Sequence, residues 1–148
     1  IKYPVYRTVA FTDILINNDV DTLESTFESI YNDNPNRDWK RSSIEYLSTF
    51  PLDSHKEIFR AILNDKEEDT FIKRNVALGF GRLKDQSSVD VIIEACKAES
   101  ETSDYNAQIF LSALSMIKGE KAKEYISSFK NSKEKSVQLL VNEILTNW

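Results

Sequence analysis

The sequence repeats itself with a period of about 33–34 residues, and this repeat restricts the possible folds more than any other pattern in the chain. Residues 39–44 (WKRSSI) match residues 72–77 (IKRNVA) one period later. The same offset aligns further apolar positions: Leu47 with Phe80, Ile58 with Val91, Phe59 with Ile92, and Leu63 with Cys96. An offset longer by one position relates Phe71 to Tyr105 and Ile92 to Ile126. A unit of this length holds two helices, which cannot bury their apolar faces alone, so the repeat predicts stacked units with a continuous core.

The composition favours helices. The chain has 148 residues but only 3 Gly and 3 Pro, against roughly ten Gly and seven Pro expected from average usage. It contains no Asn-Gly, Asp-Gly or Pro-Gly step, which are the steps that tight β-turns prefer. Because 41% of the residues are apolar, wholesale disorder is excluded. We therefore expect one all-α domain over residues 1–148, which can be a piece of a longer protein.

Apolar residues at helical spacing, together with capping residues and breakers, predict about nine short helices. The first spans roughly residues 5–16, and Asp21 is the expected N-cap of the second. Ser54 and Glu57 have the spacing of a capping box for the fourth helix. Gly119 is expected to end the seventh helix in a left-handed conformation. The remaining segments lie near residues 38–50, 71–84, 87–97, 122–129 and 137–145.

One unit has the pattern of a known family. Arg74, the run Ala-Leu-Gly at 77–79, Leu83 and Asp85 resemble the first helix of a HEAT repeat, of the shorter HEAT-like type first associated with bilin lyases. The resemblance implies a right-handed α-solenoid of about four antiparallel HEAT-like helix pairs. Gly79 and Gly81 would allow neighbouring helices to approach closely. The match is looser in residues 38–65 and 103–131, and an ordinary antiparallel helical bundle is the alternative.

Residues that carry chemistry are scarce. With 1 His and 1 Cys, the chain does not offer the clustered ligands that zinc requires, and HEAT-like di-iron hydroxylases use several His-Glu pairs that do not occur here. His55 is expected at the surface, Cys96 in the core, and the carboxylates of 67–69, Glu99 and Glu101 in solvent. We therefore predict a non-enzymatic protein without cofactor or metal, in a reducing compartment, the cytoplasm.

The charge balance bears on the type of partner. The chain carries 19 basic and 24 acidic residues, a net charge of −5, which disfavours binding to phosphate backbones or anionic membranes. No apolar run reaches the length of a membrane span. The pairs 40–41 and 73–74 are basic and lie at equivalent repeat positions, where they could form a ridge. HEAT-like DNA glycosylases use a basic concave surface with aromatic residues, so nucleic-acid binding or DNA repair is the alternative function. Trp39 aligns with Ile72, which indicates a core position instead.

The resemblance also implies where a partner binds, because the second helices of HEAT-like units line the concave face. The polar positions there mix both charges with a slight acidic excess. They are candidate residues for a protein or peptide partner, including a basic one, and a plain solvated face is the alternative. The candidate partner-binding residues are Glu28, Lys56, Arg60, Asp90, Glu94, Lys97, Lys123 and Glu124. An adaptor, a scaffold segment or a stoichiometric inhibitor would fit such a surface.

Overall fold

The structure, a computed structural model, describes residues 5–148, with side chains from residue 10 onward. This part of the chain folds into α-helices joined by short links and contains no strand, which confirms the all-α prediction. The α-helices are α1 (Val5–Asn17), α2 (Glu24–Asp33), α3 (Arg37–Thr49), α4 (Lys56–Asn64), α5 (Thr70–Leu83), α6 (Val89–Glu99), α7 (Gln108–Ile117), α8 (Glu120–Ser127) and α9 (Lys135–Thr146). Three short 3₁₀ helices precede α4, α6 and α7: η1 (Asp53–His55), η2 (Gln86–Ser88) and η3 (Asp104–Ala107).

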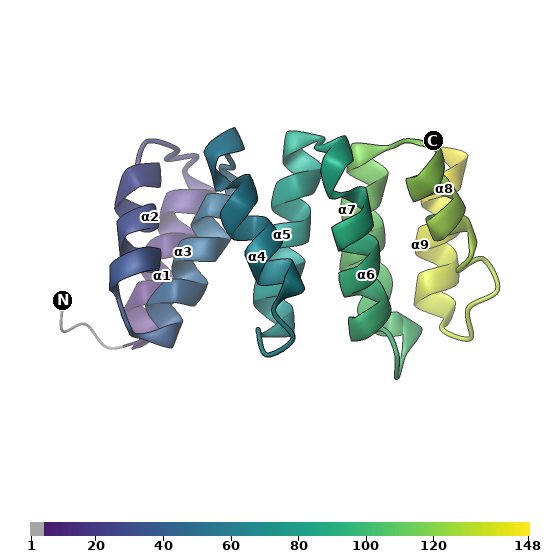
Figure 1. The fold of residues 1–148 in the computed structure, drawn as a ribbon, viewed down its shortest axis with the longest axis horizontal. Helices are drawn as coiled ribbons and strands as arrows, with labels where there is room; N and C mark the ends of the chain where they lie inside the picture. The colour runs from purple at the N-terminus through teal and green to yellow at the C-terminus, as the bar shows by residue number, and fades with distance from the viewer. Residues whose placement is uncertain (1–4) are drawn as a thin grey trace.

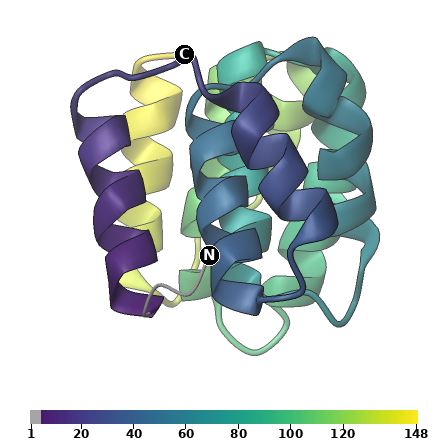
Figure 2. The same cartoon turned by 90° about the vertical axis from the view of Figure 1, so that its left-hand side faces the viewer.

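The helices progress along the longest axis of the molecule, from α1 and α2 at one end to α8 and α9 at the other (Figure 1). The even-numbered helices form the layer nearest the viewer, and the odd-numbered helices form the layer behind. The links alternate between the upper and lower ends of the helices. The odd helices also pack on one another, with α5 between α3 and α7. Figure 2 shows that α1 and α9, at opposite ends of the row, both lie on the odd-helix side.

One apolar core runs through both layers. It receives buried side chains from each successive pair of helices, among them Phe27, Leu47, Phe59, Phe80, Ile92, Leu114 and Ile126. Aromatic rings join neighbouring helices: Phe27 stacks on Tyr46 at 4.0 Å between centroids, and Phe59 meets Phe80 edge to face at 5.5 Å. Trp39 is 9% exposed, as its alignment with Ile72 predicted.

Two glycines of α5 permit its close approach to neighbouring helices. A Cβ on Gly79 would lie 2.8 Å from Cε2 of Phe59 and 3.2 Å from the Cα of Ser48. A Cβ on Gly81 would lie 3.0 Å from Sδ of Met116 on α7. The predicted role of these small residues in close packing is confirmed.

The predicted N-cap of α2 is wrong. The helix begins at Glu24 with Leu23 at its N-cap position and no side-chain cap, so Asp21 lies outside it. A tertiary contact replaces the cap, because the Tyr46 hydroxyl accepts a hydrogen bond from the Leu23 N–H at 3.1 Å and donates to the Val20 carbonyl at 2.6 Å.

Two other helix ends also differ from the prediction. Ser54 lies inside η1 and caps nothing, because His55 occupies the N-cap position of α4 without a side-chain cap hydrogen bond. Gly119 has a positive φ of 94°, but it is the N-cap of α8, and Lys118 ends α7 with a φ of 71°. The link between α7 and α8 consists of Lys118 and Gly119 alone, so Gly119 is already the N-cap of α8.

Candidate partner-binding surface

The structure places the predicted partner-binding residues on one layer of helices. Glu28 lies on α2; the other seven lie on α4 (Lys56, Arg60), α6 (Asp90, Glu94, Lys97) and α8 (Lys123, Glu124). These helices form the front layer in Figure 1. We call the set the even-helix face. Its members differ in what they contact, and the contacts decide which of them are free to meet a partner.

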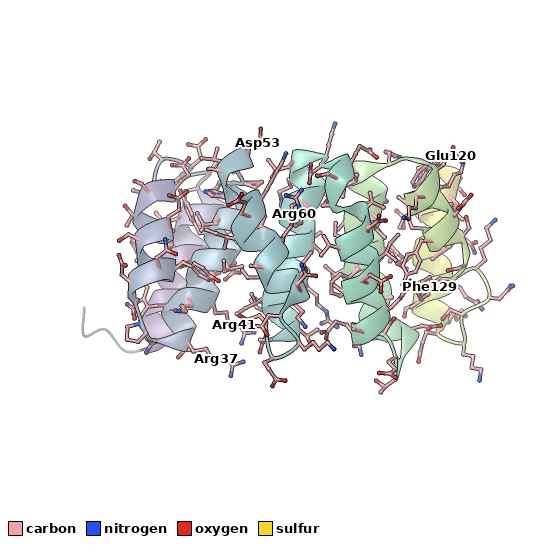
Figure 3. The ribbon with its side chains drawn as sticks, viewed as in Figure 1. Arg37, Arg41, Asp53, Arg60, Glu120 and Phe129 are labelled. Carbon is pink, nitrogen blue, oxygen red and sulfur yellow. The ribbon has the colours of Figure 1, made fainter. Side chains whose placement is uncertain are left out.

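Lys56 and Arg60 are occupied by an ion-pair cluster around Asp85, a residue that the sequence indicated only as part of a turn. The Asp85 carboxylate, 9% exposed, lies 3.3 Å from Lys56 Nζ and 3.2 Å from Arg60 Nη2. Arg60 Nη2 also donates to Ser87 Oγ at 2.5 Å, and Lys56 Nζ lies 2.7 Å from Asp53. Figure 3 shows Arg60 and Asp53 in the upper half of the view, near the middle of the helix row. The cluster ties α4 to the turn that precedes α6, so these two cations hold the two helices in place relative to one another.

Three other members of the face make only exposed pairs. Oδ1 of Asp90 lies 2.5 Å from Nζ of Lys121 on α8, and Oε1 of Glu94 lies 2.7 Å from Nζ of Lys97. The four side chains are 56% to 70% exposed. Surface ion pairs of this kind contribute about 0–1 kcal/mol. A partner could therefore re-pair these charges at little cost.

At the C-terminal end, Lys123 Nζ lies 5.6 Å from the ring centroid of Trp148, and Lys118 Nζ lies 4.6 Å from it. Glu124 is exposed, and among the described residues its side chain has neither a hydrogen bond nor an ion pair. This end of the even-helix face thus presents a carboxylate that no internal cation neutralises.

The expectation that His55 lies at the surface is wrong, since its side chain is fully buried. Its Nδ1 accepts a hydrogen bond from the Leu52 N–H at 3.0 Å. Nε2 therefore carries the hydrogen and donates it to Oε1 of Glu28 at 2.8 Å. The ring also packs against Phe59, 5.9 Å between centroids. Both ring nitrogens are thus committed to internal hydrogen bonds, and the Glu28 contact joins α2 to the start of α4.

The expectation of a solvated Glu99 is also wrong. This last residue of α6 lies 3.0 Å from Nζ of Lys73, which is only 4% exposed, and accepts a hydrogen bond from the Thr70 hydroxyl. Burial raises the pKa of Glu99, but the bonds to Thr70 and Lys73 and the charge of Lys73 outweigh it and hold the pKa below its ordinary value of 4.5. Lys73 is therefore an internal ion-pair partner and cannot belong to a basic surface ridge.

The Cys96 thiol has no exposed surface, and burial raises its pKa to about 11. Since the thiolate is the reactive form, this cysteine is a core residue, as predicted. In the described part of the chain, no three His, Cys, Asp or Glu side chains group so that they could hold a metal ion. Nor is any described helix both long and apolar enough to cross a membrane.

No protein-family model matches the chain, and the search of curated proteins finds no matching relative.

Proposed function

We propose that the chain is a HEAT-like right-handed α-solenoid that acts as a non-catalytic protein-interaction module. Its units would be α1 with α2, α3 with α4, α5 with α6 and α7 with α8, and α9 would be the first helix of a further unit. The alternation of two layers in chain order (Figure 1) supports this arrangement. The HEAT-like pattern at Arg74, residues 77–79 and Asp85 falls on α5 and the turn after it, as the family's first helix requires.

The observation that carries the proposal is a ladder of polar contacts between residues about one repeat apart. Arg37 pairs with Asp69 at 3.3 Å. Farther along the chain, Arg74 of α5 donates to Asn106 just before α7 at 3.1 Å, and Ser103 just before η3 donates to Glu134 just before α9 at 3.3 Å. Each contact spans 31 or 32 residues. Contacts that recur between neighbouring units are typical of quasi-one-dimensional arrays, whose stacked helices present extended faces to protein partners.

The chemistry of the described residues supports a non-catalytic role. General-base catalysis requires a group with a free nitrogen or oxygen near the substrate. His55 uses both ring nitrogens internally, and Glu99 is neutralised by Lys73. Cys96 is buried with a raised pKa. These three side chains thus each have a structural task.

The even-helix face is the docking surface that the family resemblance implies. Glu94, Lys97 and Glu124 are its best candidates for direct contact, because they are exposed and bound weakly or not at all. Lys56 and Arg60 would instead set the spacing of α4 and α6. The partner is a protein or peptide, and the unneutralised Glu124 favours a basic one. We place the protein in a reducing compartment such as the cytoplasm.

Affinity capture from the source cells, followed by titration calorimetry with the purified captured protein, tests the proposal. The variant E94A/K97A/E124A should weaken binding at least tenfold, whereas the control K130A, on the link after α8, should bind like the wild type. Unchanged affinity of the triple variant would contradict the assignment of this face. The test of the alternative function is a titration with duplex DNA at 50 and 200 mM salt. Tight binding that falls steeply with salt would contradict a protein-binding role and support nucleic-acid binding.

A further inference from the structure

The outer stripe of α5 combines apolar and cationic side chains. Phe71, Arg74, Leu78 and Arg82 follow one another at helical spacing on the side opposite the buried face of the helix. Phe71 is 36% exposed, Arg82 is also exposed, and Arg74 and Leu78 are half-buried. Since α5 packs laterally against α3 and α7 and α4 lies in front of it, this stripe faces the back of Figure 1.

The neighbouring helix α7 continues this surface. Tyr105, the counterpart of Phe71 one repeat later, is 59% exposed just before α7. Met116, the counterpart of Arg82, is 36% exposed at the other end of α7. It lies against α5, because its Sδ is 3.0 Å from the place that a Cβ of Gly81 would take. The two stripes therefore adjoin. We call them the α5–α7 face: Phe71, Arg74, Leu78, Arg82, Tyr105 and Met116.

The charge on this face is one-sided. Neither α5 nor α7 contains an acidic residue, although the whole chain has a net charge of −5. Arg74 donates to the neutral amide of Asn106 at 3.1 Å, and Arg82 donates to the Ser48 carbonyl at 2.7 Å. In the described part of the chain, neither guanidinium forms an ion pair with a carboxylate within 4.0 Å, although the charge of Arg74 contributes to lowering the pKa of Glu99. By contrast, Lys56, Arg60, Lys97 and Lys121 on the opposite layer all form ion pairs.

An adjacent arginine extends the same character. The guanidinium of Arg41, on α3, lies 3.9 Å from the ring centroid of Phe71. Such a stack leaves the N–H groups at the edge of the guanidinium free to meet an acceptor. Arg41 is the counterpart of Arg74 one repeat earlier, so an arginine occupies this repeat position in two successive helices of the odd-numbered layer.

We propose that the α5–α7 face docks an acidic amphipathic segment of a partner protein. Apolar side chains of the segment would cover Phe71, Leu78, Tyr105 and Met116, and its carboxylates would pair with Arg74 and Arg82, whose planar guanidinium groups match a carboxylate bidentately. The two arginines are eight residues apart on α5, about 12 Å along the axis. Carboxylates separated by four residues of an extended peptide span about the same distance.

The same observations disfavour nucleic acid as the occupant. More than half of the face is apolar, and each of its two arginines already gives one hydrogen bond to the protein. A duplex needs many cations along its phosphates, and its affinity depends on their number. An acidic peptide needs only two charge contacts and gains the rest of its affinity from burial of apolar surface. This surface is separate from the even-helix face, and its occupation does not depend on that face.

The test is selection of a displayed library of random 12-residue peptides against the whole chain. An enriched peptide is then synthesised with a fluorescent label, and its affinity is measured by anisotropy. We expect enriched sequences with aromatic or aliphatic residues and with Asp or Glu separated by about four positions. The variant R82E/Y105A should weaken the labelled peptide at least tenfold. Tyr105→Ala alone should weaken it severalfold, and it removes only a largely exposed side chain, so it tests the face without endangering the fold.

The matched control is K130E, which makes the same change of charge as R82E at an exposed residue on the link after α8 and should leave the affinity within twofold of the wild type. Enriched peptides that are basic, or whose affinity is lost in the control and retained in R82E/Y105A, would overturn the assignment of the α5–α7 face while leaving a protein-binding function intact. Failure to enrich any peptide would overturn it as well. This holds whether or not the chain binds duplex DNA in a tight, salt-dependent way that R82E/Y105A abolishes. Only the DNA result would also contradict the proposed function.

Discussion

His55 connects three parts of the N-terminal half, and its replacement by alanine should destabilise the protein strongly. The ring is fully buried, accepts the Leu52 N–H at 3.0 Å, and donates to Glu28 at 2.8 Å. Alanine would leave the Leu52 N–H without its acceptor, which costs about 1–3 kcal/mol. It would also leave a cavity beside Phe59, for which a large-to-small core substitution costs about 2 kcal/mol or more.

The sum predicts that His55→Ala lowers the free energy of unfolding by about 3–5 kcal/mol. At about 2–4 °C for each kcal/mol in a chain of this size, the melting temperature should fall by about 10 °C. Urea unfolding followed by far-UV circular dichroism measures the free energy, and differential scanning calorimetry measures the melting temperature. An unchanged m-value would show that the variant unfolds over the same amount of surface.

Two further variants separate the contributions. Asparagine at position 55 can place Oδ1 near the position of Nδ1 and accept the Leu52 N–H, so His55→Asn should cost about 1–2 kcal/mol less than His55→Ala. Glu28→Gln keeps an acceptor for Nε2–H on a side chain that is 36% exposed, and should cost less than about 1 kcal/mol. A cost of under about 1 kcal/mol for His55→Ala would contradict the predicted role of the ring, as would an asparagine variant that is as unstable as the alanine variant.

Three other residues give independent predictions. Gly79→Ala should lower the free energy of unfolding by about 1 kcal/mol in urea, because crowding against Phe59 outweighs the better helix propensity of alanine; a gain in stability would contradict the close approach. With a pKa of about 11, native Cys96 should be almost unreactive toward Ellman's reagent at pH 8 and react fully in 6 M guanidinium chloride, so rapid native labelling would show an accessible thiolate. The pKa of Glu99 lies below its ordinary value of 4.5 in the folded state, so its contribution to stability is complete above pH 4.5 and is lost as the pH falls through the folded pKa. The urea midpoint should therefore depend less on pH between pH 5 and pH 3 in Glu99→Gln than in the wild type. An equal dependence on pH in the two proteins would contradict the lowered pKa.

Much of the helical architecture could be predicted because it follows from short-range patterns. Apolar spacing placed α5 between residues 71 and 84, and the structure has it at Thr70–Leu83. The equivalence of Trp39 and Ile72 in the repeat assigned Trp39 to the core, where the structure has it. The small residues at Gly79 and Gly81 indicated close helix approach, which the distances to Phe59 and Met116 confirm. The HEAT-like family, the solenoid and its handedness remain proposals, since residue patterns shared by many helical proteins do not distinguish them.

The candidate surface was much less predictable, because residues distant in the sequence decide which charges are free. Nothing near Lys56 or Arg60 in the sequence shows that Asp85 binds both. Glu99 follows an ordinary solvated pattern and yet pairs with buried Lys73, 26 residues earlier. On the α5–α7 face the relation is reversed, since Arg74 and Arg82 have only neutral hydrogen-bond partners although acidic residues outnumber basic ones overall.

Local patterns in the sequence are enough to establish that this chain is helical, where most of its helices lie and which residues form its core, because apolar periodicity and the scarcity of Gly and Pro act within one or two turns of the backbone. The burial of His55, the Tyr46 hydroxyl that replaces the cap of α2, and the arginines that lack a carboxylate become visible only in the folded molecule. The physical reason is that hydrogen bonds and ion pairs act over about 3–4 Å, so their partners come within reach only once the helices have packed.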